Sequence, residues 1–258
     1  MTIRVGIAGI TGRMGRLLVE EVPAAGATLS GGTGRAGSGK PAPTGVAVLP
    51  DLAALAANSD VVIDFTHAST AQTSAATMAR SGKAWVLGSS GLSTADEAAV
   101  ETAARSIPIV YASNFSTGVN LVLALCERMG AALPAETYDA EIMEMHHRQK
   151  VDAPSGTAVG MGRAVAKGRG QKLEDVMVSG RHGHSGARET GAIGFAALRG
   201  GQVVGEHTLI FASATEHIAL THRAFDRRAF ATGAVRAALW VVGRAPGLYS
   251  MMDVLGMT

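Results

Sequence analysis

Short, largely apolar runs alternate with helical patterns along the first half of the chain. The runs occupy residues 3–8, 27–30, 60–65, 84–87 and 107–111. Segments with apolar residues at helical spacing separate them, and the clearest of these cover residues 68–80 and 94–105. Apolar strands separated by helices of this length are typical of a doubly wound parallel sheet. The pattern therefore predicts an α/β domain.

The pattern changes in the second half, where strands follow one another without intervening helices. Helices are predicted at residues 118–133 and 155–167, with strands at 138–145, 176–179, 191–198, 202–211 and 216–222. Such a run of strands favours a second, α+β domain with a mainly antiparallel sheet. A last helix at residues 227–242 is expected to return to the first domain. We therefore divide the chain into residues 1–117 with 227–258, and residues 118–226.

Composition narrows the class of protein. With 258 residues, 47% of them hydrophobic, the chain can bury a sizeable core. The formal charge of +2 comes from dispersed residues, so we expect no nucleic-acid partner. The only cysteine, Cys126, excludes an internal disulfide and fits a reducing compartment. The chain starts on a strand-like segment without a signal peptide, and no apolar run approaches the roughly 18–20 residues of a membrane span. We therefore expect a soluble, cytoplasmic protein.

A glycine-rich loop lies between the first strand and a helical pattern. From Gly9 to Gly15 it is Gly-Ile-Thr-Gly-Arg-Met-Gly. In this setting the first glycine allows a tight turn, Gly12 lets the backbone approach a pyrophosphate, and Gly15 lets helix and strand pack closely. Thr11 stands where a second glycine is usual. The loop favours a Rossmann-like dinucleotide-binding domain, with a glycine-rich turn that binds nothing as the alternative.

The region about twenty residues past the glycine loop bears on which dinucleotide binds, since an acidic residue there would hold the ribose 2′-hydroxyl of NAD. That region has no Asp or Glu, and Gly34 precedes Arg35. An arginine without a neighbouring carboxylate suits a 2′-phosphate. The sequence therefore favours NADPH, with NADH as the second candidate. The alternative is that Arg35 and Lys40 are surface charges in a polar loop.

Polar turns follow three of the predicted strands, after Phe65, Leu87 and Tyr111. Ligands of doubly wound sheets bind at the carboxyl ends of the strands. Small polar residues are common in any such turn, but here the turns align with a glycine loop. We therefore expect all three to meet one cofactor.

A cationic cluster in the second half is the clearest candidate for binding a small anion. Its members, within five positions, are His146, His147, Arg148 and Lys150. A helix-start signal, Pro154-Ser155-Gly156-Thr157, follows. Cationic side chains followed by the free amides of a helix N-terminus can bind a carboxylate or phosphate. A solvated basic turn is the alternative, but the apolar neighbours Met143, Met145 and Val151 suggest a site partly shielded from water.

Other chemistry fits these residues less well. Adjacent histidines on an extended segment tend to point to opposite faces, and no nearby Cys or spaced His completes a metal-ligand set, so we predict no metal site. Ser155 lacks the strand–turn–helix setting of a hydrolase nucleophile and is better explained as a helix N-cap. His182 and His184 lie in a glycine-rich segment that favours a surface turn.

The segment from Glu144 to Ala158 also resembles a family signature. It reads Glu-Met-His-His-Arg-Gln-Lys-Val-Asp-Ala-Pro-Ser-Gly-Thr-Ala and is similar, almost without gaps, to the E-x-HH-x-x-K-x-D-A-P-S-G-T-A signature of the 4-hydroxy-tetrahydrodipicolinate reductases (dihydrodipicolinate reductases). The likeness also covers residues 9–15, 64–66, 114–120, 191–195, 205–207 and 247–253. Three departures are Thr11, the pair Ser89-Ser90 where Thr-Thr is common, and Gly34 where an acid often precedes the arginine. The last departure favours NADPH.

The resemblance implies a reduction on the bacterial route to diaminopimelate and lysine, and a role for each matching residue. His146 and Lys150 would be the catalytic proton donors, and His147, Gly156 and Thr157 would bind the substrate. Arg148 has no such role and is expected to be a structural or surface charge. The residues expected to hold the pyrophosphate are Gly9, Ile10, Thr11, Gly12, Arg13 and Met14, and Arg35 would hold the 2′-phosphate. Those expected beside the nicotinamide are Gly88, Ser89, Ser90, Ala112, Ser113, Asn114 and Phe115. The family likeness further implies a homotetramer formed through the second-domain sheet.

The chemistry of the residues agrees with these roles. Reduction of a conjugated cyclic imine dicarboxylate needs a hydride on a ring carbon, a proton, and anchors for two carboxylates. Lys150 can bind a carboxylate or release a proton, and a histidine with a pKa near ~6.5 can act as a general acid. A non-catalytic dinucleotide-binding regulatory protein and a different small-acid dehydrogenase remain the alternatives.

Overall fold

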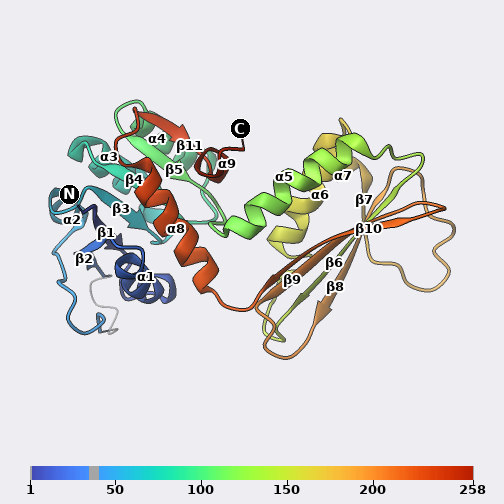
Figure 1. Ribbon diagram of the computed structural model, residues 1–258, viewed down its shortest axis with the longest axis horizontal. Coiled ribbons are helices and arrows are strands. Elements are labelled where there is room, and N and C mark those ends of the chain that lie inside the picture. Colours follow the sequence, from blue (N-terminus) through green and yellow to red (C-terminus); the bar gives the residue numbers. More distant parts are fainter. Residues whose placement is uncertain (1, 35–40, 258) are drawn as a thin grey trace. The chain divides into compact units, whose positions relative to one another are not determined.

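The computed structural model describes residues 2–34 and 41–257, so that the predicted site residue Arg35 lies outside the described part (Figure 1). The chain divides into two compact units, Met1–Thr117 with Arg228–Thr258, and Gly118–Arg227. Among the described residues, no helix is both long and apolar enough to cross a membrane.

The first unit is a parallel sheet covered by helices on both faces. Its six strands are β1 (Arg4–Ala8), β2 (Thr28–Thr33), β3 (Val61–Asp64), β4 (Ala84–Leu87), β5 (Pro108–Tyr111) and β11 (Gly247–Tyr249), in the order β11-β5-β4-β3-β1-β2. Every pairing is parallel. The strand order reverses beside β1, which makes this the point where a doubly wound sheet binds its ligand. The predicted Rossmann-like fold is confirmed.

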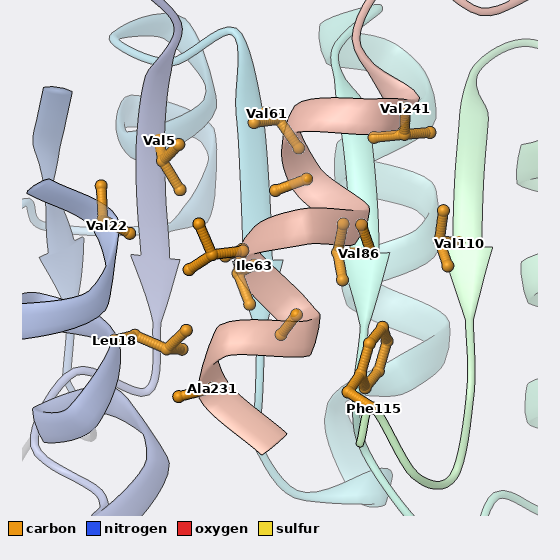
Figure 2. Packing of buried hydrophobic residues seen from close by; sticks show 14 of the residues in the cluster. Val5, Leu18, Val22, Val61, Ile63, Val86, Val110, Phe115, Ala231 and Val241 are labelled. Atoms are coloured by element: carbon orange, nitrogen blue, oxygen red, sulfur yellow. The ribbon is translucent and has the colours of Figure 1, made fainter. Parts of the chain in front are cut away.

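Two apolar cores fill the spaces between this sheet and its helices. The helices are α1 (Arg13–Ala24), α2 (Leu52–Ala57), η1 (Ala68–Thr70), α3 (Ala71–Ser81), α4 (Thr94–Ala104), α8 (Arg228–Val241) and α9 (Met251–Leu255). One core contains residues of α1, α8 and α9, and the other contains residues of α2, α3 and α4. Figure 2 shows the first of these, with α8 lying across the strands that carry Val61, Ile63 and Val86. The last helix thus belongs to the first unit although its sequence follows the second.

Gly233 makes this close packing of α8 possible. A Cβ added there would lie 1.7 Å from the carbonyl oxygen of Phe115. In a free helix, alanine is favoured over glycine by about 1 kcal/mol. Overpacking in a core costs about 1–3 kcal/mol, and a clash with backbone leaves little room to relax.

Gly233→Ala is therefore expected to lower the free energy of unfolding, as measured by urea titration. Gly160→Ala is the matched control, since the added Cβ would meet the two methyl groups of Leu123, at 3.4 and 3.9 Å, in ordinary contact. It should leave stability unchanged or slightly raised. A stabilising Gly233→Ala would contradict the packing described here.

The second unit places helices against one face of a five-stranded sheet. Its helices are α5 (Thr117–Ala132), which starts on the last residue of the first unit, α6 (Gly156–Gly168) and α7 (Leu173–Val176). Its strands are β6 (Asp139–His146), β7 (Met177–Ser179), β8 (Ile193–Arg199), β9 (Gly205–Ala212) and β10 (His217–Ala224), in the order β10-β9-β6-β8-β7. Buried residues of β6, β8 and β9 share a core with α5, α6 and α7.

This sheet is mixed rather than mainly antiparallel as predicted. β9 pairs antiparallel with β6 and β10, whereas β8 pairs parallel with β6 and β7. Parallel neighbours need long connections. The chain supplies two, the stretch through α6 and α7 after β6 and the thirteen residues from Gly180 to Ala192 after β7. Reading the helix at 155–167 as a crossover would have predicted the mixed sheet.

Candidate functional site

The glycine loop of the first unit has the backbone that a dinucleotide phosphate needs. Gly9 has a φ of 87°, a left-handed conformation that favours glycine. A Cβ on Gly15 would lie 2.3 Å from the Gly9 carbonyl oxygen, so only glycine lets α1 start this close to the loop. Gly12, the N-cap of α1, provides no capping side chain. The first amides of α1 therefore stay available to an anion.

A pocket of about 360 Å³ adjoins this loop at the carboxyl ends of β1, β2 and β3. It is lined by Gly9, Thr11, Gly12, Thr33, Gly34, Phe65, Thr66, His67, Ser69 and Thr70. Its location is the point of strand-order reversal. Its glycine-lined wall fits a dinucleotide better than it fits a bulky apolar ligand.

The remaining predicted cofactor residues differ in what they can offer. Gly88 packs against the Phe65 ring, which lies 2.3 Å from where its Cβ would be. Ser89 is buried and donates its hydroxyl to the Thr66 carbonyl oxygen at 2.8 Å. Phe115 is buried edge-on to Phe65. The side chains of Ser89 and Phe115 are thus used in packing and internal hydrogen bonding, so that a cofactor would contact the backbone of these residues.

The other predicted cofactor residues range from exposed to fully buried. Arg13, Ser90 and Ser113 are exposed, and Met14 and Ala112 are half-buried. The Asn114 side chain accepts a hydrogen bond from the Ser116 amide at 2.8 Å and so shapes its own turn. Ile10 is fully buried in the core, which leaves only its backbone at the loop surface.

In the second unit, the buried carboxylate of Glu144 holds the ring of His146, the predicted proton donor. Glu144 and His146 alternate along β6 and so point to the same, inward face. The Nδ1 atom of His146 lies 2.6 Å from Glu144 Oε2. Arg199 of β8 donates to both oxygens of Glu144, at 2.8 and 2.9 Å, and the Ser155 amide donates to Oε1 at 3.1 Å. His146 is thus held by a carboxylate that Arg199 and the Ser155 amide hold in turn through three hydrogen bonds.

The electrostatics of this cluster follow from burial and from its charges. Burial lowers the pKa of His146 below its usual value, and the charges of Lys150 and Arg199 act in the same direction, against the opposing effect of Glu144. Burial acts to raise the pKa of Glu144, but hydrogen bonds from Arg199 and His146 hold it below the usual range. At neutral pH the carboxylate is therefore ionised and His146 is mostly neutral.

His207 of β9 completes the buried cluster. It lies opposite Glu144 in the sheet, and its ring stands edge-on to His146 with centroids 5.0 Å apart. Its Nε2 lies 2.9 Å from Ser155 Oγ. Burial lowers the pKa of His207 to about 4, with smaller contributions from His146 and His222. His207 is therefore neutral through the physiological range.

Lys150 follows β6 by four residues, and its charge acts on the same cluster. Its Nζ donates to both carboxylate oxygens of Asp152, at 2.8 and 2.9 Å. The Lys150 side chain is 19% exposed against 58% for Asp152, so the lysine is partly sheltered behind its partner.

The predicted shielding by Val151 is wrong, because that residue is 98% exposed. Glu144, Gly205 and His207 surround His146 instead.

The start of α6 offers two backbone donors beside this cluster. Ser155 is the N-cap, as predicted, and its hydroxyl accepts from the Ala158 amide at 3.2 Å. The first backbone bond of the helix runs from Val159 to Ser155. The amides of Gly156 and Thr157 precede it and have no acceptor within the helix. Gly156 is exposed, so a carboxylate can reach these amides.

The other histidines and cations of the second unit differ in setting. His147 is half-buried, its amide donates to the Val203 carbonyl oxygen at 2.8 Å, and its buried ring Nδ1 has no hydrogen-bond partner among the residues that the structure describes. Such an orphaned polar atom is suited to a ligand. Arg148, His182 and His184 are exposed, as expected for surface residues. Within the described residues, no group of three or more His, Cys, Asp or Glu could hold a metal ion.

Several residues of the two sites were not predicted from the sequence. Alternation along β6 was the available signal for Glu144, a carboxylate at an inward position. Arg199 and His207 lie 55 and 63 residues beyond Glu144, and only the strand register brings them to it. The signal for His67, Ser69 and Thr70 was their place after β3, at the predicted ligand edge.

Comparisons with known proteins place both units in one family. Residues 3–115 match the family model "Dihydrodipicolinate reductase, N-terminus", and residues 118–255 match its C-terminal counterpart. The chain is 68% identical over 256 residues to the 4-hydroxy-tetrahydrodipicolinate reductase of Granulibacter bethesdensis, covering 99% of this chain and 98% of the relative. It is 62% identical over 255 residues to that of Acidiphilium cryptum, with coverage of 99% and 98%.

A solved structure gives the same result. The dipicolinate-bound dihydrodipicolinate reductase of Paenisporosarcina sp. TG-14 superposes with a TM-score of 0.80 at 25% identity, covering 98% of this chain and 99% of that one. The family-model matches span the residues of the glycine loop and of the cluster around His146. This chain therefore belongs to the dihydrodipicolinate reductase family.

Proposed function

We propose that this protein reduces 4-hydroxy-tetrahydrodipicolinate to tetrahydrodipicolinate, with loss of the 4-hydroxyl group as water, in diaminopimelate and lysine biosynthesis, with NADPH as its preferred cofactor. The observation that carries the proposal is the setting of His146 and Lys150. A buried imidazole and a sheltered ammonium lie in the same unit as the free amides at the start of α6. A small dicarboxylate needs such a combination of proton donors and anion-binding groups.

The first unit supplies the cofactor site. The amides at the start of α1 and the backbone of the glycine loop would hold the pyrophosphate, and the turns after β4 and β5 would meet the nicotinamide. The bound nicotinamide supplies the hydride. Arg35 is proposed from the sequence as the group that holds the 2′-phosphate, with no acidic residue nearby to favour NADH.

The second unit supplies the substrate groups and the proton. Lys150, His147 and the amides of Gly156 and Thr157 are the proposed carboxylate anchors. The Paenisporosarcina reductase binds dipicolinate, an aromatic dicarboxylate, and supports this substrate class. Because Nδ1 of His146 is bonded to Glu144, Nε2 is the atom that would pass a proton to the reduced ring. Because burial lowers the pKa of His146, its protonated fraction already falls below neutrality, and kcat/KM should decline as pH rises through that range.

The test is to follow loss of the NADPH absorbance band with the product of dihydrodipicolinate synthase as substrate. Rapid oxidation by the purified protein, with a lower KM for NADPH than for NADH, is the expected result. Nucleotide binding without oxidation would instead support the non-catalytic regulatory protein. Oxidation with other small acids but not with this product would support a different dehydrogenase.

The assembly proposed with this function is a homotetramer formed through the second sheet, in a reducing, cytoplasmic setting. The outward face of β6, β8 and β9 carries several apolar residues: Met143, Met145, Ala196, Leu198 and Ile210. Met143 and Leu198 are 44% and 46% exposed, although apolar sheet faces are usually covered. Light scattering on the purified chain should give the mass of four copies, and a monomer mass would contradict the assembly.

A further inference from the structure

We propose that Glu144 and Arg199 are positioning residues for His146: the carboxylate holds the ring through Nδ1 and leaves Nε2 as the atom that exchanges the proton, while the guanidinium offsets the carboxylate's charge. The inference deepens the proposed function, because it rests on His146 as the proton donor. The contacts themselves do not depend on that role, so the two can be tested separately.

The carboxylate is saturated with hydrogen bonds. Oε2 receives the His146 ring and one Arg199 nitrogen, and Oε1 receives the other Arg199 nitrogen and the Ser155 amide. A carboxylate has about four lone-pair sites, and all of them are used. Glu144 is only 1% exposed, so no water competes for it. It is thus a fixed acceptor rather than a base that can take the proton itself.

The orientation of the imidazole follows from this acceptor. Because ionised Glu144 can only accept, the neutral ring keeps its hydrogen on Nδ1. Nε2 then carries the lone pair and is the atom that titrates. Gly205 leaves room beside it, since a Cβ at that position would lie 3.0 Å from Nε2. The backbone of β9 thus avoids covering the atom that the carboxylate leaves free.

The charges around His146 come from several elements. Glu144 shares β6 with it, Arg199 faces it from β8, and Lys150 acts from the following loop. His207 faces it from β9, with His222 of β10 beyond. Without Arg199, the charge of Glu144 would raise the pKa of His146, and the imidazolium would then be a weaker acid. Arg199, bound to both oxygens, offsets that effect.

Arg199 also reaches the second proposed proton donor. Its Nη2 donates to the Asp152 carbonyl oxygen at 2.6 Å, and the Asp152 carboxylate holds Lys150. One guanidinium therefore fixes the carboxylate behind His146 and the backbone beside Lys150. A lysine at position 199 would keep the charge but could not span these acceptors in the same planar geometry.

The experiment is a titration of the His146 ring by NMR in protein with labelled histidine, with the signal assigned by its loss in His146→Asn. Glu144→Gln removes the negative charge and leaves Arg199 and Lys150, so the titration midpoint should fall. Arg199→Gln removes the cation and leaves the carboxylate, so the midpoint should rise. Each shift is expected to be about one pH unit or more, since charges within hydrogen-bonding distance have effects of this size. Arg199→Lys should stay close to the unaltered protein.

The matched control is Arg181→Gln. Arg181 makes an equally close two-pronged pair with Glu141 on the same strand, at 3.0 and 2.9 Å, but on the other face of the sheet. Its loss should leave the His146 midpoint unchanged. The pH profile of kcat/KM should move in the same direction as the midpoint in each variant of the cluster.

The opposite shifts of the His146 titration midpoint in Glu144→Gln and Arg199→Gln distinguish a positioning role from a purely structural one. A loosened site would let water reach the ring, and both Glu144→Gln and Arg199→Gln would then move the midpoint up towards about 6.5. That result, or no shift in either variant, overturns the inference. Shifted midpoints with no reductase activity in the unaltered protein would uphold the network and reject the proposed function. Active variants with shifted midpoints and an unmoved pH profile would reject His146 as the proton donor.

Discussion

Replacing Lys150 by alanine is expected to lower kcat/KM for the dicarboxylate substrate by about 10²–10⁴-fold, the range that removal of a proton-transfer group typically costs. The variant loses both a carboxylate anchor and a candidate proton donor. NADPH affinity should stay nearly unchanged, because the proposed cofactor groups all belong to the other unit. Steady-state kinetics and a fluorescence titration of NADPH measure the two quantities separately.

Arg148→Ala is the matched control for this prediction. Arg148 is a cation two residues from Lys150, but its side chain is exposed, and its amide donates to the Gly201 carbonyl oxygen at 3.3 Å. Its loss should leave kcat/KM close to that of the unaltered protein. An equal loss in both variants would mean that the general charge of the loop matters, and not Lys150. A collapse of NADPH affinity in Lys150→Ala would contradict the division of the site between the units.

Acid is expected to destabilise the second unit well before its carboxylates are protonated. The pKa of His207 is about 4 in the folded protein and 6.5 in the unfolded chain. The unfolded chain therefore takes up a proton first as pH falls, and stability is lost from about pH 6.5 downwards. For a residue only 4% exposed, this amounts to about 2–3 kcal/mol by pH 4.5. His146 and His222, whose pKa values burial also lowers, act in the same direction.

Urea unfolding between pH 7.5 and 4.5, followed by circular dichroism, measures this loss. Above pH 4.5 the stabilisation from the depressed pKa of Glu144 is still present. Burial raises the pKa of Asp64, which changes stability in the opposite direction, so the comparison with a histidine variant is what isolates His207. His207→Asn should flatten the dependence of stability on pH. His217→Asn, on the exposed side of the same sheet, should retain it. Equal slopes for His207→Asn and the unaltered protein would show that His207 is not the group responsible.

The sequence was most informative where a segment's pattern is local. Strands β1, β3, β4 and β5 each end at or within one residue of the prediction, because buried apolar runs bounded by glycine or polar residues mark their own limits. Three-residue β11 is too short to show any alternation, and it pairs with β5 about 140 residues away. Helix α9 was missed although Ser250 and Asp253 form a capping box and Gly256 ends the helix at a φ of 67°. That signal was present and overlooked.

The candidate site residues also divide into those with a local sequence signal and those that only the fold brings together. The His146–Lys150 segment could be found because its residues are contiguous, and the turn chemistry of Gly9 to Gly15 is equally local. Glu144 lies within the same segment, but its role depends on Arg199 and Ser155. The strand order and the parallel pairing of β8 with β6 decide which residue of β8 meets β6, whereas the sequence predicted only a mainly antiparallel sheet. The burial of Glu144, His146 and His207 likewise depends on the pairing of β6 with β8 and β9, which no local sequence pattern predicts.

The return of α8 to the first unit bears on how the protein forms during synthesis. Seven buried residues of α8 contribute to one face of the first sheet, so that face stays open until more than nine-tenths of the chain has left the ribosome. Gly118–Arg227 is continuous and complete before then. Since domains fold as units in the order of their emergence, the inserted segment should be the first to become protease-resistant on stalled ribosomes. The earlier-synthesised sheet would wait for it, exposed to chaperones that bind apolar strands.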